Sequence, residues 1–120
     1  MLDDYSTFIP TTMERIKRIK SEVPTEEIYK ELAEEASELA QAALKMCRLV
    51  SETNPTDTPP DEAYNNLVEE YTDVLNIATR LLELEPDWLI GDYKLYRWCM
   101  RLDKAKESNS DGCGDDYCNF

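Results

Sequence analysis

A long apolar repeat with helical spacing, between Pro24 and the proline-rich stretch at residues 53–60, constrains this chain most. Thr25 is a suitable N-cap residue for this segment, and we place the end of the segment near Glu52. One face is apolar at steps of three and four residues: Ile28, Leu32, Ala36, Leu39, Ala43, Met46 and Val50. The pattern predicts one long amphipathic α-helix.

Three further segments have helical periodicity, and prolines separate them. The first covers residues 10–23, the next begins at a cap on Asp61, and the last opens at Pro86, where a helix tolerates proline. Their apolar positions are Ile16, Ile19 and Val23; then Tyr64, Leu67, Tyr71, Val74, Ala78 and Leu81; then Trp88, Leu95, Cys99 and Leu102. We predict an all-α fold, an antiparallel bundle of about four helices in one domain at residues 1–106, with a flexible acidic tail at 107–120.

Charge and composition exclude several kinds of function. The net charge is −13, which disfavours binding to nucleic acid and to anionic membranes. The chain has no histidine, so Ser-His and Cys-His catalysis are excluded, and its four cysteines form no CxxC pair for zinc. We find no signal peptide and no apolar run of about 20 residues, so we expect a cytoplasmic protein.

Acidic side chains lie at helical spacing beside the apolar faces of two segments. At about 100° per residue, Glu35 and Glu38 lie about 60° apart, and so do Glu70 and Asp73. If the two helices pack antiparallel, the pairs converge, and such a cluster needs a cation to offset its repulsion. Oxygen-only ligands favour magnesium, manganese or calcium. Acidic helix flanks are also common as plain solvated surface, so spacing alone leaves both interpretations open.

The acidic motifs themselves narrow the choice. Glu34-Glu35-Ala36-Ser37-Glu38 matches EExxE, and Glu70-Tyr71-Thr72-Asp73 matches ExxD. Over residues 24–102 the chain resembles the MazG-like all-α nucleoside triphosphate pyrophosphohydrolases, and phage-type and Firmicute-type members most of all. The resemblance implies Mg²⁺, with Mn²⁺ as a substitute, bound by Glu35, Glu38, Glu70 and Asp73. It also implies a homodimer or homotetramer.

The activity that the resemblance implies is hydrolysis of a (deoxy)nucleoside triphosphate to a monophosphate and pyrophosphate, as housekeeping of the nucleotide pool. Glu34 or Glu35 would accept the proton of the attacking water, as catalytic base. The candidate substrate-binding residues are Lys45, Lys94, Arg97, Arg101, Asn66 and Asn76. The basic residues of the last helix also fit a solvated face, where cations suit a helix C-terminus.

Two other functions stay open from the sequence. One is a catalytically inactive helical module that binds a partner protein through its acidic flanks. The other is a phosphoribosyl-ATP pyrophosphohydrolase. The sequence does not decide which base or sugar is preferred.

Overall fold

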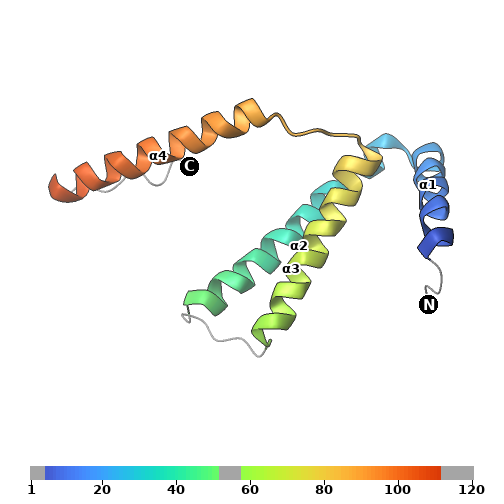
Figure 1. Ribbon diagram of the computed structural model, residues 1–120, viewed down its shortest axis with the longest axis horizontal. Coiled ribbons are helices and arrows are strands. Elements are labelled where there is room, and N and C mark those ends of the chain that lie inside the picture. Colours follow the sequence, from blue (N-terminus) through green and yellow to red (C-terminus); the bar gives the residue numbers. More distant parts are fainter. Residues whose placement is uncertain (1–4, 52–57, 112–120) are drawn as a thin grey trace. The chain divides into compact units, whose positions relative to one another are not determined.

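The computed structural model describes residues 5–51 and 58–111, and helices make up nearly all of them (Figure 1). The elements are α1 (Tyr5–Glu22), α2 (Thr25–Ser51), α3 (Pro60–Leu75), a π-helical segment η1 (Asn76–Leu81) and α4 (Trp88–Asp111). The described residues contain no strand, so the predicted all-α class with four main helices is confirmed. None of the described helices combines the length and apolar character that crossing a bilayer requires.

The chain divides into two units, residues 1–84 and residues 85–120. The first contains α1, α2, α3 and η1, and the second contains α4. Helix α4 continues past the predicted domain end at residue 106 and reaches Asp111. Residues 112–120, the rest of the predicted tail, lie outside the described residues.

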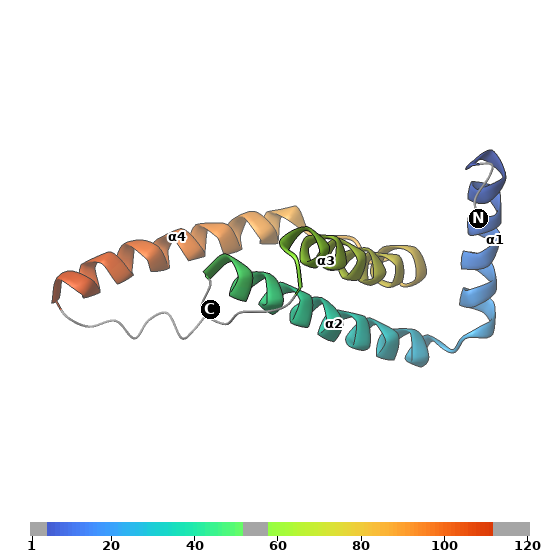
Figure 2. The same cartoon turned by 90° about the horizontal axis from the view of Figure 1, so that it is seen from below.

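Helices α2 and α3 form an antiparallel hairpin, and the two views show them side by side (Figures 1 and 2). The positions that face the partner helix, here called the seam, are buried or half-buried and recur at alternating steps of four and three. They are Ile28, Leu32, Glu35, Leu39, Ala42, Met46 and Leu49 on α2, and Ala63, Leu67, Glu70, Val74, Ile77 and Leu81 on α3 and η1. This spacing is that of a coiled-coil contact. Two seam positions, Glu35 and Glu70, are therefore acidic.

The seam differs from the predicted apolar faces. Ala36, Ala43 and Val50 are exposed on α2, with Val50 at 79%, and on α3 Tyr64 and Tyr71 are 56% and 52% exposed. The prediction was wrong at these positions because each helix has two adjacent rows of mostly apolar residues. The predicted faces took the exposed row where the seam residue was Glu35 or Glu70, and also where it was apolar, as at Ala42 and Leu49. The apolar arc of each helix is wider than the seam and extends onto an exposed face.

The starts of α2 and α3 lie one or two residues from their predicted caps. The carbonyl of Pro24 accepts the first helical hydrogen bonds of α2, so Pro24 has the N-cap position and Thr25 lies in the first turn. Pro59 is the N-cap of α3, which leaves Asp61 inside the first turn. There its negative charge suits the positive end of the helix dipole.

Helix α4 begins at a side-chain cap. One carboxylate oxygen of Asp87 accepts hydrogen bonds from the backbone N–H groups of Leu89 and Ile90, at 3.1 and 3.2 Å. Asp87 is therefore the N-cap residue, and Pro86 precedes the helix instead of opening it.

The π-helical segment η1 ends the hairpin. The N–H of Leu82 donates to the carbonyl of Ile77 at 2.9 Å, five residues back, and Glu83 then leaves the helix with a φ of 55°. Helix α1 packs against η1, and the ammonium of Lys20 lies 3.0 Å from the carboxylate of Glu83. These contacts hold α1 against η1, at the end of the hairpin where α2 begins.

Candidate metal centre

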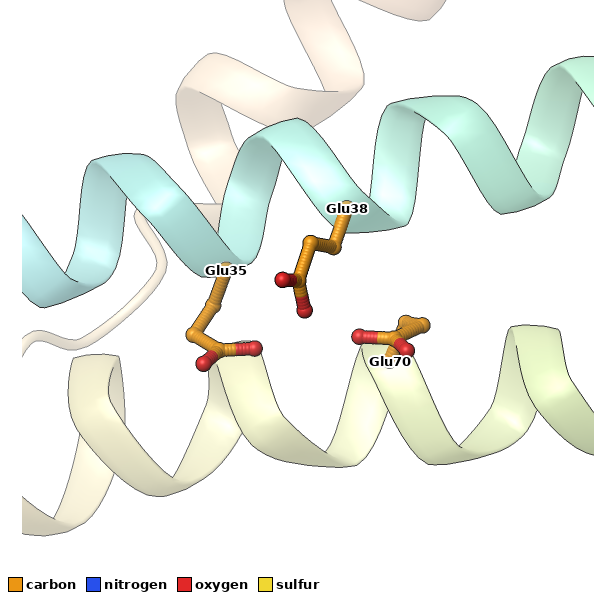
Figure 3. Close-up of side chains that lie close together, drawn as sticks. All are labelled: Glu35, Glu38 and Glu70. Carbon is orange, nitrogen blue, oxygen red and sulfur yellow. The ribbon is translucent and has the colours of Figure 1, made fainter.

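Three carboxylates converge on the seam of the α2–α3 hairpin (Figure 3). Glu35 and Glu38 come from α2 and Glu70 comes from α3, and one oxygen of each lies within 4.8 Å of the others. Glu35 and Glu70 are half-buried because they occupy seam positions, whereas Glu38 lies at the edge of the seam and is exposed. The antiparallel packing thus brings Glu35 and Glu38 of EExxE beside Glu70 of ExxD, three of the four carboxylates that were expected to converge.

The two seam glutamates each have an oxygen atom that is cut off from solvent. The Oε2 atoms of Glu35 and Glu70 are buried, and neither has a hydrogen-bond partner. Buried carboxylate oxygens without a partner are rare and costly. Three carboxylates that converge on one point offer the ligand type that a hard divalent cation takes. These residues therefore fit a hard divalent cation.

Burial and charge act in the same direction on these groups. The pKa of Glu35 is raised, first by burial and then by the negative charges of Glu38, Asp73 and Glu70. The pKa of Glu70 is also raised, first by burial and then by the Glu38 carboxyl group and the charge of Asp73. The folded structure therefore disfavours the ionised form of both carboxyl groups.

A pH dependence of stability follows. With both pKa values raised, the folded protein binds more protons than the unfolded chain at pH values between the ordinary and the raised pKa, so stability falls as the pH rises through this window. Without metal, we expect the Tm to fall as the pH rises from the ordinary glutamate pKa of 4.5 toward the raised pKa values of Glu35 and Glu70. The Glu35→Gln/Glu70→Gln double variant should show a shallower fall, since its amides do not titrate.

The measurement is a set of thermal unfolding curves in a chelator. The double variant is the matched control because every other carboxylate remains in it. Parallel pH profiles for the two proteins would contradict the prediction and assign the whole slope to the general negative charge.

Two other predicted residues lie outside the three-carboxylate group. Asp73 is half-buried and close enough for its charge to raise the pKa of both seam glutamates, but it does not join the cluster within 4.8 Å. Glu34 is exposed on α2 and is not part of the group either. Thr72, inside ExxD, is exposed and donates a hydrogen bond to the carbonyl of Val68, so its side chain stays out of the site.

A groove of about 450 Å³ opens beside the carboxylates and continues along α2 toward its C-terminal end. Glu38 and Glu70 lie at its wall together with the predicted residues Lys45 and Asn66. Gln41 and Arg48 also line it, and sequence analysis missed both. On α2, Gln41, Lys45 and Arg48 follow Glu38 at steps of three, four and three residues, so they lie on one side of the helix. This spacing was the sequence signal that could have identified Gln41 and Arg48. A second hollow of about 370 Å³ shares Lys45 and Asn66.

The remaining predicted residues lie elsewhere in the described part of the chain. Asn76 starts η1 and lines a separate pocket of about 260 Å³ against α1. Lys94, Arg97 and Arg101 belong to α4 in the second unit, where the Arg97 guanidinium lies 6.0 Å from the centre of the Tyr93 ring.

No protein-family model, curated protein or solved structure matches this chain significantly. What this site does must therefore be argued from its own residues.

Proposed function

We propose that this protein is a Mg²⁺-dependent hydrolase that converts a nucleoside triphosphate to a monophosphate and pyrophosphate. The observation that carries the proposal is the convergence of Glu35, Glu38 and Glu70, with two buried oxygens that lack partners. Glu38 and Glu70 line a groove that also contains two cationic side chains, Lys45 and Arg48. An anionic substrate that carries a metal ion suits this groove, because the carboxylates would bind the metal and the cations would offset the negative charge of the substrate.

Glu35, Glu38 and Glu70 would hold the metal, and Asp73 contributes negative charge beside them. Bound there, Mg²⁺ would neutralise phosphate oxygens and make the α-phosphorus open to attack by water. We assign proton acceptance from that water to Glu35, because its carboxylate belongs to the cluster and so lies beside any water bound there. Glu34 is the weaker candidate since its side chain is exposed.

The distribution of charge along the groove favours one orientation of the substrate. Its carboxylates and its cations are separated along α2, because Lys45 comes seven residues after Glu38, about 10 Å of helix. Phosphate groups beyond the one under attack would lie toward Lys45 and Arg48, where positive charge offsets theirs. Asn66 and Gln41 offer amide groups between the two ends.

Removing the positive charge of Lys45 or Arg48 should therefore weaken substrate binding more than it slows the chemical step. We expect Lys45→Gln and Arg48→Gln each to raise KM about tenfold, with kcat changed less than about threefold. Lys30→Gln is the control, because Lys30 is exposed on the same helix and its ammonium lies 3.3 Å from the Glu27 carboxylate. Steady-state kinetics at varied substrate concentration measure both constants. An unchanged KM in both variants would remove the groove from the substrate site.

Product analysis tests the reaction itself. The protein is incubated with a panel of canonical and modified nucleoside triphosphates, with and without Mg²⁺. Formation of monophosphate and pyrophosphate only with Mg²⁺ supports the proposal and identifies the preferred base and sugar. Formation of diphosphate and phosphate would show cleavage of the wrong bond.

A second function, binding of a partner protein without catalysis, is favoured by the many apolar side chains exposed on α4, including Trp88 at 73% and Leu89 at 81%. The two functions differ in their need for metal. A protein that only binds a partner should have the same Tm with and without Mg²⁺ and turn over no triphosphate. The homodimer or homotetramer that the MazG resemblance implies remains part of the main proposal.

A further inference from the structure

The pocket between α1 and η1, here called the α1–η1 pocket, has a volume of about 260 Å³, and its whole wall belongs to the first unit. Ile16 and Ile19 from α1 and Leu81 from η1 supply aliphatic surface, and each element also supplies one arginine, Arg15 or Arg80. Pockets for whole small molecules usually measure about 300–1,000 Å³, so this one suits one end of a larger ligand.

The two arginines of the α1–η1 pocket have no acidic partner. Neither guanidinium forms an ion pair or a hydrogen bond within the part of the chain that the structure describes. No described residue of the pocket wall is acidic, although the chain has 26 acidic and 13 basic residues. A guanidinium has five N–H donors and no acceptor. The pocket therefore presents hydrogen-bond donors that the protein does not use itself, beside aliphatic surface.

The α1–η1 pocket and the groove lie on the same side of α3. At about 100° per residue, Asn66 of the groove is turned about 40° from Glu70, and Asn76 of the pocket is turned about 120° in the same direction. Asp73 lies between them, at about 60°. Along the helix, Asn66 is about 6 Å to one side of Glu70 and Asn76 about 9 Å to the other. The carboxylates therefore lie between the groove and the pocket.

This order decides which end of a nucleoside triphosphate the α1–η1 pocket would take. With the α-phosphorus at the carboxylates and the outer phosphates toward Lys45 and Arg48, the nucleoside extends in the opposite direction, toward Asn76. The wall chemistry agrees with this direction. The faces of a base are apolar and pack on Ile16, Ile19 and Leu81, whereas a phosphate group would lose its water there without gaining contacts.

We propose that Arg15 and Arg80 make this protein selective for a 6-oxopurine base, such as guanine or hypoxanthine, bound in the α1–η1 pocket. The inference rests on the proposed hydrolysis of nucleoside triphosphates and names the class of base. A 6-oxopurine presents two adjacent acceptors, O6 and N7, which one guanidinium binds with two hydrogen bonds. Adenine has an amino group in place of O6, so a donor would face a donor and a hydrogen bond would be lost.

The test compares inosine triphosphate with ATP, whose bases differ only at the edge that carries position 6. The wild type should have a kcat/KM at least about tenfold higher for inosine triphosphate. Arg15→Gln or Arg80→Gln, whichever removes the guanidinium on the base edge, should lower this ratio at least about fivefold, because glutamine both donates and accepts and so tolerates adenine. Arg18→Gln is the matched control, since Arg18 lies on the same helix outside the pocket wall and pairs with Glu22 at 2.7 Å.

Calorimetric titration with inosine monophosphate and with AMP, in the presence of Mg²⁺, gives a second readout that needs no turnover. Inosine monophosphate should bind at least about tenfold more tightly. Hydrolysis of both triphosphates with equal kcat/KM would overturn the inference and leave the proposed function intact. Base-selective binding without hydrolysis of any triphosphate would overturn the proposed function alone. A ratio that stays unchanged in both arginine variants, with weaker binding of both nucleotides, would assign phosphate to the pocket and overturn the inference.

Discussion

Replacing Glu38 with glutamine is expected to lower kcat/KM for triphosphate hydrolysis by at least about 1,000-fold. Glutamine keeps the size of the side chain and removes its charge. Glu38 is the exposed member of the three-carboxylate group, so the change leaves the seam intact. The loss therefore reports on the metal and the reaction. We expect the melting temperature without metal to change by no more than a few degrees.

Glu26→Gln is the matched control, because Glu26 is exposed in the first turn of the same helix and lies outside the cluster. It should keep wild-type activity. Initial rates are measured over a range of Mg²⁺ concentrations, since a weakened site needs more metal for the same rate. If Glu38→Gln were as active as the wild type at every concentration, the cluster would not be the catalytic centre.

The sequence predicted most of the cluster but not its depth. Spacing indicated that Glu35, Glu38, Glu70 and Asp73 would converge if the two helices packed antiparallel, and the hairpin brings the first three together. It did not show that Glu35 and Glu70 occupy the seam, because an apolar stripe passes over acidic positions by construction. Seam positions can be assigned only when the packing of the facing helix is known, because that packing decides which residues are covered.

Asp73 shows another limit of sequence patterns. The ExxD spacing puts it on the same side of α3 as Glu70, but the two differ in side-chain length by one methylene group. Asp73 also lies in the last turn of α3, where the N–H of Asn76 bonds to the carbonyls of Thr72 and Asp73 and the helix widens into η1. Its carboxylate consequently stays outside the 4.8 Å group while its charge still acts on it.

Arg48 was missed for a different reason. It is exposed near the end of α2, where a cation is favoured by the helix dipole whatever its function. Only the groove that it shares with Glu38 and Lys45 distinguishes it from other surface cations. Grooves between helices depend on which side chains are small at the contact, such as Ala42 here, and a single-helix pattern does not contain that information.

The second large effect is expected at Glu35, where leucine should stabilise the metal-free protein and abolish its response to metal. Glu35 lies on the seam between Leu32 and Leu39, and its Oε2 atom is buried without a partner. Leucine continues the apolar spacing, removes that oxygen and removes one of the crowded negative charges. We expect the Tm in a chelator to rise by several degrees, with loss of hydrolysis.

The wild type should behave in the opposite way when metal is added. A cation that binds only the folded protein stabilises it by about 2.7 kcal/mol at 100 times its dissociation constant. Addition of Mg²⁺ should therefore raise the Tm of the wild type and leave that of Glu35→Leu unchanged. Glu34→Leu is the control, because an exposed leucine one residue away gains no burial. A lower Tm for Glu35→Leu in the chelator would mean that the carboxylate is favourable where it lies. If instead the Tm rises as expected, the seam keeps a destabilising residue, and metal binding is the physical reason that fits.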